Sequence, residues 1–121
     1  RGFDEALFTD RGGLVVECTG ANVFMVKDGR VTAVAHDDAL DGITRDTLLR
    51  LSGAQARPVP LAELLEADEV FACGTAAEVA PVAQIEDRRY GDNPVTRELA
   101  ELYGRVVRGR EHAWRHWLTE V

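Results

Sequence analysis

The sequence predicts one α+β domain with an antiparallel-rich sheet and helices on its outside, and three observations carry this prediction. The first half of the chain alternates short runs of β-type residues with turn residues. From Ile43 onward, apolar residues instead recur at the spacing of a helix face. The 121 residues are 45% hydrophobic and 29% charged, which is the composition of a folded globular domain.

The first half is expected to form strand pairs. Asp28-Gly29 stands between two β-rich runs, and a two-residue Asp-Gly turn in that position is the strongest short-range signal for a hairpin. A second group of turn residues, at 10–13, separates two shorter runs. The expected strands are residues 6–8, 14–16, 22–27 and 30–35.

Helices and further strands are expected in the middle of the chain. The residues Ile43, Thr47, Leu48 and Leu51 recur at the spacing i, i+4, i+5 and i+8 of one helix face. They predict a helix from about Thr44 to Ser52, and Gly53 ends it. Residues 57–60 hold two prolines and predict an extended connector. The other expected elements are a short helix over 61–67, a strand over 69–73, and a strand over 78–85 that ends at the turn 86–87.

The C-terminal region is expected to form two helices. Asn93-Pro94 predicts a helix start, since the asparagine side chain caps free amides and proline suits the first helical position. This helix is expected to run to about Arg108, where Gly109 breaks it. A short terminal helix with Trp114, Trp117 and Leu118 is then expected to pack back on the body.

Charge and cysteine content exclude several classes of function. The formal net charge is −7, with thirteen arginines and one lysine spread along the chain, which argues against a nucleic acid or an anionic membrane as partner. Two cysteines without C-x-x-C spacing predict neither a disulfide framework nor a zinc site. With no transmembrane run and no signal pattern, a cytoplasmic location is expected. The chain opens on Arg1, which is consistent with a piece cut from a longer protein or recorded without its start.

Three loops rich in small and hydroxyl residues are candidates for a binding site, at 17–20, 40–46 and 73–78. The middle loop leads into a helix N-terminus, whose free amides suit a phosphate or a carboxylate. Its alternative is an ordinary helix start that binds water. The third loop places four small residues after a strand, which either lets the backbone approach a ligand or forms a tight turn that needs glycine.

Single polar residues leave similar alternatives. Glu17 ends an apolar run and is either a half-buried acid with a charged partner or a solvent-exposed strand residue. The histidines His36, His112 and His116 show no spacing of metal ligands, so no metal site is predicted.

Read together, the motifs resemble the C-terminal part of the fold-type IV aminotransferases that use pyridoxal 5'-phosphate, most closely the branched-chain amino-acid aminotransferases. The resemblance covers nearly the whole chain in order, as one domain over residues 1–121. The motifs that carry it are Phe3-Asp4-Glu5-Ala6-Leu7, Glu17-Cys18-Thr19-Gly20-Ala21-Asn22-Val23-Phe24, Val26-Lys27-Asp28-Gly29, Gly42-Ile43-Thr44-Arg45-Asp46, Ala67-Asp68-Glu69-Val70-Phe71, Gly74-Thr75-Ala76-Ala77-Glu78-Val79, Pro81-Val82, Gly91-Asp92, Pro94-Val95-Thr96 and Trp117-Leu118-Thr119.

The resemblance implies a barrel-like sheet and a role for each matching residue. Glu17 matches the acid that pairs with the pyridinium nitrogen of the cofactor. Ile43 and Thr44 match the helix N-terminus that holds the cofactor phosphate, and Thr75 matches a second phosphate contact. The amides of Thr75 and Ala76 match the groups that receive the substrate carboxylate.

The chain also departs from the family pattern. Ala21 stands where a second glutamate is usual, Asp41 replaces a proline before the phosphate-loop glycine, and Cys18 replaces a glycine. A carboxylate at residue 41 is unfavourable beside a phosphate unless it points away. These changes suggest a divergent member of the family.

The catalytic lysine is the larger departure. In the family the lysine that forms the Schiff base lies upstream of the Phe3-Asp4-Glu5 segment, so it is expected upstream of Arg1, together with a small N-terminal domain. Lys27 is the single lysine, but it matches an exposed hairpin lysine of the family and is not expected to be catalytic. No catalytic residue is therefore expected in this chain.

The resemblance implies transamination between an amino acid and a 2-oxo acid, with 2-oxoglutarate and glutamate as the second pair. It needs the N-terminal portion, in cis or as a separate chain, and a homodimer is the family expectation. Two alternatives stay open: a non-catalytic partner subunit with the same fold, and a lyase or D-amino-acid transaminase of the same fold type.

Overall fold

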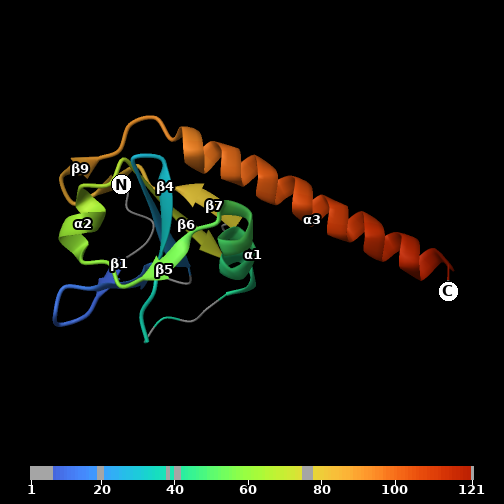
Figure 1. The fold of residues 1–121 in the computed structure, drawn as a ribbon, viewed down its shortest axis with the longest axis horizontal. Helices are drawn as coiled ribbons and strands as arrows, with labels where there is room; N and C mark the ends of the chain where they lie inside the picture. The colour runs from blue at the N-terminus through green and yellow to red at the C-terminus, as the bar shows by residue number, and fades with distance from the viewer. Residues whose placement is uncertain (1–6, 19–20, 38, 40–41, 75–77, 121) are drawn as a thin grey trace.

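The computed structural model describes residues 7–18, 21–37, 39, 42–74 and 78–120, and within these ranges it describes all side chains except those of 43, 78 and 108–120. The described residues form three helices, a five-stranded sheet and two small two-stranded sheets (Figure 1). The predicted α+β class is confirmed. The elements are β1 (Leu7–Thr9), β2 (Val15–Cys18), β3 (Asn22–Lys27), β4 (Arg30–Val34), α1 (Ile43–Ser52), β5 (Gln55–Arg57), α2 (Leu61–Leu65), β6 (Glu69–Gly74), β7 (Glu78–Pro81), β8 (Gln84–Ile85), β9 (Arg88–Arg89) and α3 (Pro94–Glu120).

The main sheet has the strand order β5-β4-β3-β6-β7. Its neighbours are antiparallel except β4 and β5, which run parallel because α1 carries the chain across between them. Among the described residues the sheet is open, with β5 and β7 at its edges, and β1 pairs with β2 in a separate sheet. The barrel-like closure implied by the resemblance is not seen in this part of the chain.

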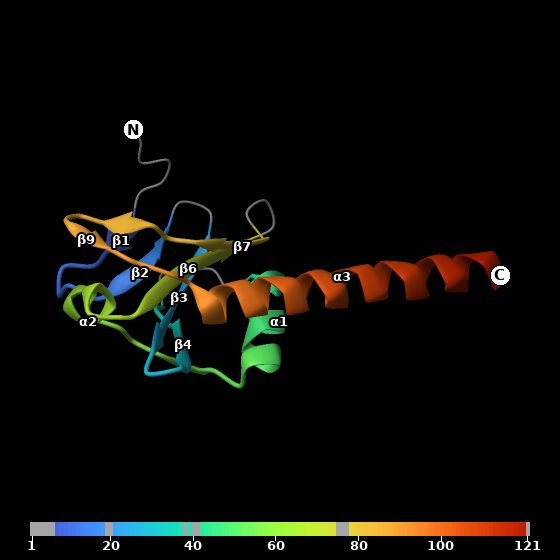
Figure 2. The ribbon, with the colours of Figure 1, turned by 90° about the horizontal axis from the view of Figure 1, so that it is seen from above.

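The central strand β3 has both faces buried. Its side chains alternate, so Val23 and Met25 belong to a core under α2 and the small sheets, while Phe24 and Val26 belong to a core under α1 and α3. Phe24 stacks on Phe71 of β6 with ring centroids 4.9 Å apart. Figures 1 and 2 show the same division, with α2 on one side of the sheet and α1 on the other.

Local turn chemistry explains the elements that were predicted correctly. Asp28 and Gly29 have φ angles of 52° and 77°, the left-handed pair that a tight hairpin turn between β3 and β4 requires. Gly53 ends α1 in a left-handed conformation, with φ 68°, and its amide donates to Leu49. α1 begins one residue earlier than predicted.

Other element boundaries differ from the prediction where a strand forms by pairing with a segment distant in the sequence. Residues 55–57 form the edge strand β5 against β4, although the prolines that follow suggested a connector. The predicted strand 78–85 divides into β7, which pairs with β6, and β8, which turns at Glu86 to pair with β9. α2 ends at Leu65 rather than residue 67. Residue 6 of the first predicted strand lies outside the described residues.

The prediction of two C-terminal helices was wrong. α3 is continuous from Pro94 to Glu120, passes through Gly109, and extends away from the body in both views (Figures 1 and 2). A glycine costs only about 1 kcal/mol in a helix, and α3 accommodates both Gly104 and Gly109. The side chains of Trp114, Trp117 and Leu118 lie outside the described ones.

The cap of α3 also differs from the prediction. The buried carboxylate of Glu69 accepts hydrogen bonds from the backbone amides of Val95 (N to O 3.2 Å) and Thr96 (2.8 Å). β6 therefore supplies the cap that Asn93 was expected to supply. The Asn93 side-chain oxygen is buried without a hydrogen-bond partner among the described residues.

Candidate functional site

Asn22 joins segments that are far apart in the sequence. As the first residue of β3 it lies opposite Cys73 at the end of β6, and its side-chain oxygen accepts the amide of Gly42 before α1 at 3.3 Å. Cys18 at the end of β2 pairs with Ala21, immediately before Asn22. The described ends of the three candidate loops therefore lie close together around Asn22.

The N-terminus of α1 has no side-chain cap among the described residues. Gly42 is the N-cap residue and offers no side-chain oxygen to the first amides of the helix. Asp41, immediately before it, lies outside the described residues. A Cβ on Gly42 would lie 3.2 Å from the Asn22 oxygen, so glycine permits the close approach of the two segments. Free amides and the positive end of the helix dipole suit an anion.

Thr44, the second residue of α1, is buried, with 6% of its surface exposed. Its hydroxyl oxygen lies 3.2 Å from the phenolic oxygen of Tyr103 in α3. α3 therefore reaches the first turn of α1.

Arg45 adds positive charge at the same place. The residue is 8% exposed, and its guanidinium donates to the carbonyl of Val34 at 3.4 Å. Burial raises the pKa of the Cys73 thiol to about 12, and the positive charge of Arg45 acts in the opposite direction. The positive charge of Arg45 thus acts on Cys73, near the end of β6, as well as at the first turn of α1.

Glu17 lies in β2 opposite Phe8 of β1 and is half-buried. A half-buried strand position is compatible both with an acid that has a charged partner and with a residue at the solvent edge. The role of Glu17 therefore stays a prediction. Ile43 contributes the first turn of α1, and its side chain is not among those described. Thr75 and Ala76 lie outside the described residues, between the ends of β6 and β7.

Asn22 and Tyr103 were not among the predicted site residues. A signal existed for Asn22, because a polar amide stands immediately before the four apolar residues of β3. Tyr103 lies one helical turn after the buried Leu99, a position that spacing alone assigns to the core.

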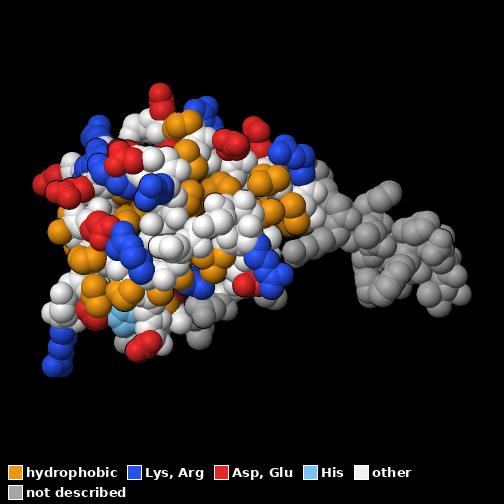
Figure 3. Space-filling view, viewed as in Figure 1, with side chains coloured by type: hydrophobic (Ala, Val, Ile, Leu, Met, Phe, Trp, Pro, Cys, Tyr) orange, Lys and Arg blue, Asp and Glu red, His pale blue; other side chains and the backbone are white. Residues whose placement is uncertain are grey.

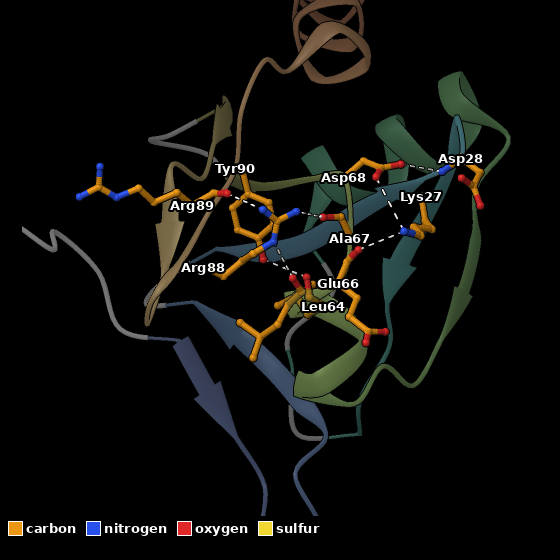
Figure 4. Close-up of polar contacts among 10 residues, drawn as sticks. Lys27, Asp28, Leu64, Glu66, Ala67, Asp68, Arg88, Arg89 and Tyr90 are labelled. Carbon is orange, nitrogen blue, oxygen red and sulfur yellow. Dashed lines mark hydrogen bonds and ion pairs between the residues drawn. The ribbon is translucent and has the colours of Figure 1, made fainter.

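Lys27 lies far from this site. It is the last residue of β3 and Asn22 is the first, so five strand steps, roughly 16 Å, separate their backbones. The Lys27 ammonium donates to the carbonyl of Glu66 at 3.2 Å and lies 3.8 Å from the carboxylate of Asp68 (Figure 4).

Lys27 belongs to a group of side chains that caps the C-terminal end of α2 (Figure 4). Arg88 donates to the carbonyls of Leu65 and Ala67, and the Tyr90 hydroxyl donates to that of Leu64. Lys27 donates to the carbonyl of Glu66, so the four successive carbonyls of residues 64–67 all accept a side-chain hydrogen bond. The donors come from β3 and from the β8–β9 region. The structure gives Lys27 a structural partner and no place in the candidate site.

Metal and nucleic-acid sites find no support in the described residues. No group of three or more described His, Cys, Asp or Glu residues is placed to hold a metal ion. His36 pairs with Asp10 at 2.9 Å, and His112 and His116 lie beyond the described side chains. On the face shown in Figure 3, basic and acidic side chains are interspersed. No helix in the described part of the chain is long and apolar enough to cross a membrane.

Comparison with known proteins shows the family of this chain. Residues 1–85 match the family model of the class IV amino-transferases, and the chain belongs to that family. Among curated relatives, it is 39% identical over 130 residues to a probable branched-chain-amino-acid aminotransferase of Aquifex aeolicus and 36% identical to the branched-chain-amino-acid aminotransferase of Escherichia coli K12. Each match covers 99% of this chain and 42% of the relative, so the chain spans about two fifths of their length.

Solved structures agree. A T.th. branched-chain amino acid aminotransferase, complexed with N-(5'-phosphopyridoxyl)-L-glutamate, is 41% identical and superposes with a TM-score of 0.85 over 96% of this chain and 41% of that one. The branched-chain aminotransferase of Thermoproteus uzoniensis, with norvaline, is 37% identical, with a TM-score of 0.83 over 96% of this chain and 41% of that one.

Proposed function

We propose that this chain forms the C-terminal, cofactor-holding part of a branched-chain-type aminotransferase. The complete enzyme would exchange the amino group between a branched-chain amino acid and 2-oxoglutarate. The observation that carries this proposal is the start of α1, which has no side-chain cap and lies against Asn22, where the described ends of three loops come together. It has the form of an anion site, and the similar T.th. structure holds a phosphopyridoxyl compound.

Each site residue has a proposed task. The amides of Ile43 and Thr44 and the Thr44 hydroxyl bind the phosphate, Thr75 adds a second phosphate contact, and the charge of Arg45 favours the anion. Glu17 keeps the pyridine nitrogen protonated. When bound, pyridoxal phosphate supplies an electron sink for the pair released at the substrate Cα. The amides of Thr75 and Ala76 receive the substrate carboxylate.

The remaining chemistry is assigned to an N-terminal portion. The relatives are more than twice as long as the matched region. Lys27, at the far end of β3, is hydrogen-bonded to the carbonyl of Glu66. The proposal therefore places the lysine that holds the cofactor aldehyde and moves the proton in that portion. The barrel-like closure of the sheet and a homodimer belong to the same proposal.

Pyridoxamine 5'-phosphate is the probe that tests this proposal, because it carries the phosphate and ring but needs no lysine. Titration calorimetry of the 121-residue chain should show saturable binding. Gly42→Val should weaken this binding, because its Cβ would lie 3.2 Å from the Asn22 oxygen and push the two segments apart. Transamination of leucine should appear only after addition of the N-terminal portion of a relative. A chain that folds but does not bind pyridoxamine phosphate contradicts the proposal.

One observation favours a second candidate, a non-catalytic partner subunit. Ala21, where the family usually carries a second glutamate, is buried beside Cys18 and offers the site no carboxylate. The same titration separates the two candidates, because the partner subunit would fold without measurable affinity for the probe.

A further inference from the structure

We propose that Tyr103 is a positioning residue that orients the hydroxyl of Thr44 toward the cofactor phosphate. This inference rests on the proposed function and deepens it, since it assigns to α3 a part in holding the cofactor. It starts from the polar contact between Thr44 and Tyr103, whose oxygens are 3.2 Å apart.

The contact joins segments that are separated by 59 positions in the sequence. Thr44 lies in the first turn of α1, where the anion site is proposed, and Tyr103 lies in α3. The two helices contact each other (Figure 2). Tyr103 packs against the core that contains Leu48 and Leu99. Thr44 lies one helical turn before Leu48 in α1.

The hydrogen-bonding capacity of the two hydroxyls fixes their roles. A phosphate dianion can only accept hydrogen bonds, so the Thr44 hydroxyl must donate its single proton to the phosphate. The Thr44 oxygen then has lone pairs left and accepts a proton from Tyr103, since a phenol donates better than an aliphatic alcohol. Without Tyr103, the threonine hydroxyl is free to rotate toward other acceptors, such as backbone carbonyls.

The first turns of α3 are anchored well enough for this task. Glu69 accepts the amides of Val95 and Thr96, which fixes the start of α3 on β6. Leu99 is buried, and Tyr103 follows one turn later on the same helix face. A positioning hydroxyl needs such a rigid support.

The experiment measures the affinity of the 121-residue chain for pyridoxamine 5'-phosphate by titration calorimetry, together with its melting temperature. Tyr103→Phe, which removes only the hydroxyl, should weaken binding about fivefold to tenfold, the size of one hydrogen bond. Thr44→Val should weaken it at least as much. In the double variant Tyr103→Phe should add nothing, because it acts through the Thr44 hydroxyl.

Tyr90→Phe is the matched control, because it removes a buried tyrosine hydroxyl that bonds to Leu64 on the other side of the sheet. It should lower the melting temperature and leave the affinity unchanged. Equal affinities of Tyr103→Phe and the parent chain, or additive losses in the double variant, would overturn the role of Tyr103 and leave the proposed function standing. A parent chain that does not bind the probe overturns both.

Discussion

At the scale of single residues, partners decide what each polar group can do. Asn22 and Lys27 stand at opposite ends of one strand, yet one holds the start of α1 and the other caps α2. Sequence motifs pointed to Glu17, Thr44 and Thr75, because these residue types recur in the family pattern. Neither Asn22 nor Tyr103 was among the predicted site residues, because the importance of each comes from contacts made across the fold.

The partners of Lys27 lead to a first prediction. Lys27→Ala should leave the visible absorbance after addition of pyridoxal phosphate the same as for the parent chain, because the ammonium is bound at the end of α2. Stability should fall by less than about 1 kcal/mol, as is usual for an exposed pair. Absorbance spectra and urea unfolding check both points. A visible band present in the parent and lost in the variant would contradict this assignment.

The pair Asp10–His36 leads to a prediction about acid stability. The hydrogen bond from His36, followed by the amide of Leu14, lowers the pKa of the Asp10 carboxyl below its ordinary value of 3.8. A depressed folded pKa means that this carboxylate stabilises the fold above pH 3.8 and loses that contribution as the pH falls through the folded pKa.

Asp10→Asn keeps an acceptor for the amides of Gly12 and Leu14 but removes the charge. Urea midpoints measured between about pH 2 and pH 6 should therefore change less steeply with pH in the variant than in the parent chain. Parallel profiles for the two chains would contradict the argument.

At the scale of elements, local signals were sufficient where an element is closed by its own turn residues. The β3–β4 hairpin follows from Asp28-Gly29, and the end of α1 follows from Gly53. Local signals failed where a distant partner decides. β5 is a strand because β4 offers a free edge, and α3 begins under the carboxylate of Glu69, which lies far before Asn93 in the sequence.

The cap of α3 gives a prediction at this scale. Glu69→Ala should lower the free energy of unfolding by about 2 kcal/mol, because two amides of α3 lose a buried acceptor. Glu69→Gln is the matched control and should lose less, since its amide oxygen still accepts one bond. Thermal unfolding followed by circular dichroism checks the order. Equal stability of Glu69→Ala and the parent chain would show that the contact does not cap the helix in solution.

At the scale of the whole molecule, one sheet separates two cores. Cys18 lies in the core under α2 and Cys73 in the core under α1, and both thiols are buried. Burial also raises the pKa of Cys73 to about 12, so its thiol stays neutral and unreactive at about pH 8.

The reactivity of each thiol therefore measures how far the core on one face of the sheet has opened. In Cys18→Ala and Cys73→Ala, the remaining thiol should react slowly with a disulfide reagent in the folded chain. Both should become reactive over the same range of urea concentration, because β3 and β6 serve both cores. Separate transitions for the two variants would show that one face opens without the other.

The two outer strands of the main sheet also bear on how this chain behaves at high concentration. β5 is three residues long and is followed directly by Pro58, while β7 ends in Pro81. Short strands bounded by proline offer few free amides and carbonyls to a neighbouring molecule, so edge-to-edge growth into aggregates is disfavoured. The chain covers about two fifths of the length of its relatives, and its main sheet is open among the described residues. The short edge strands nevertheless disfavour self-association through strand pairing.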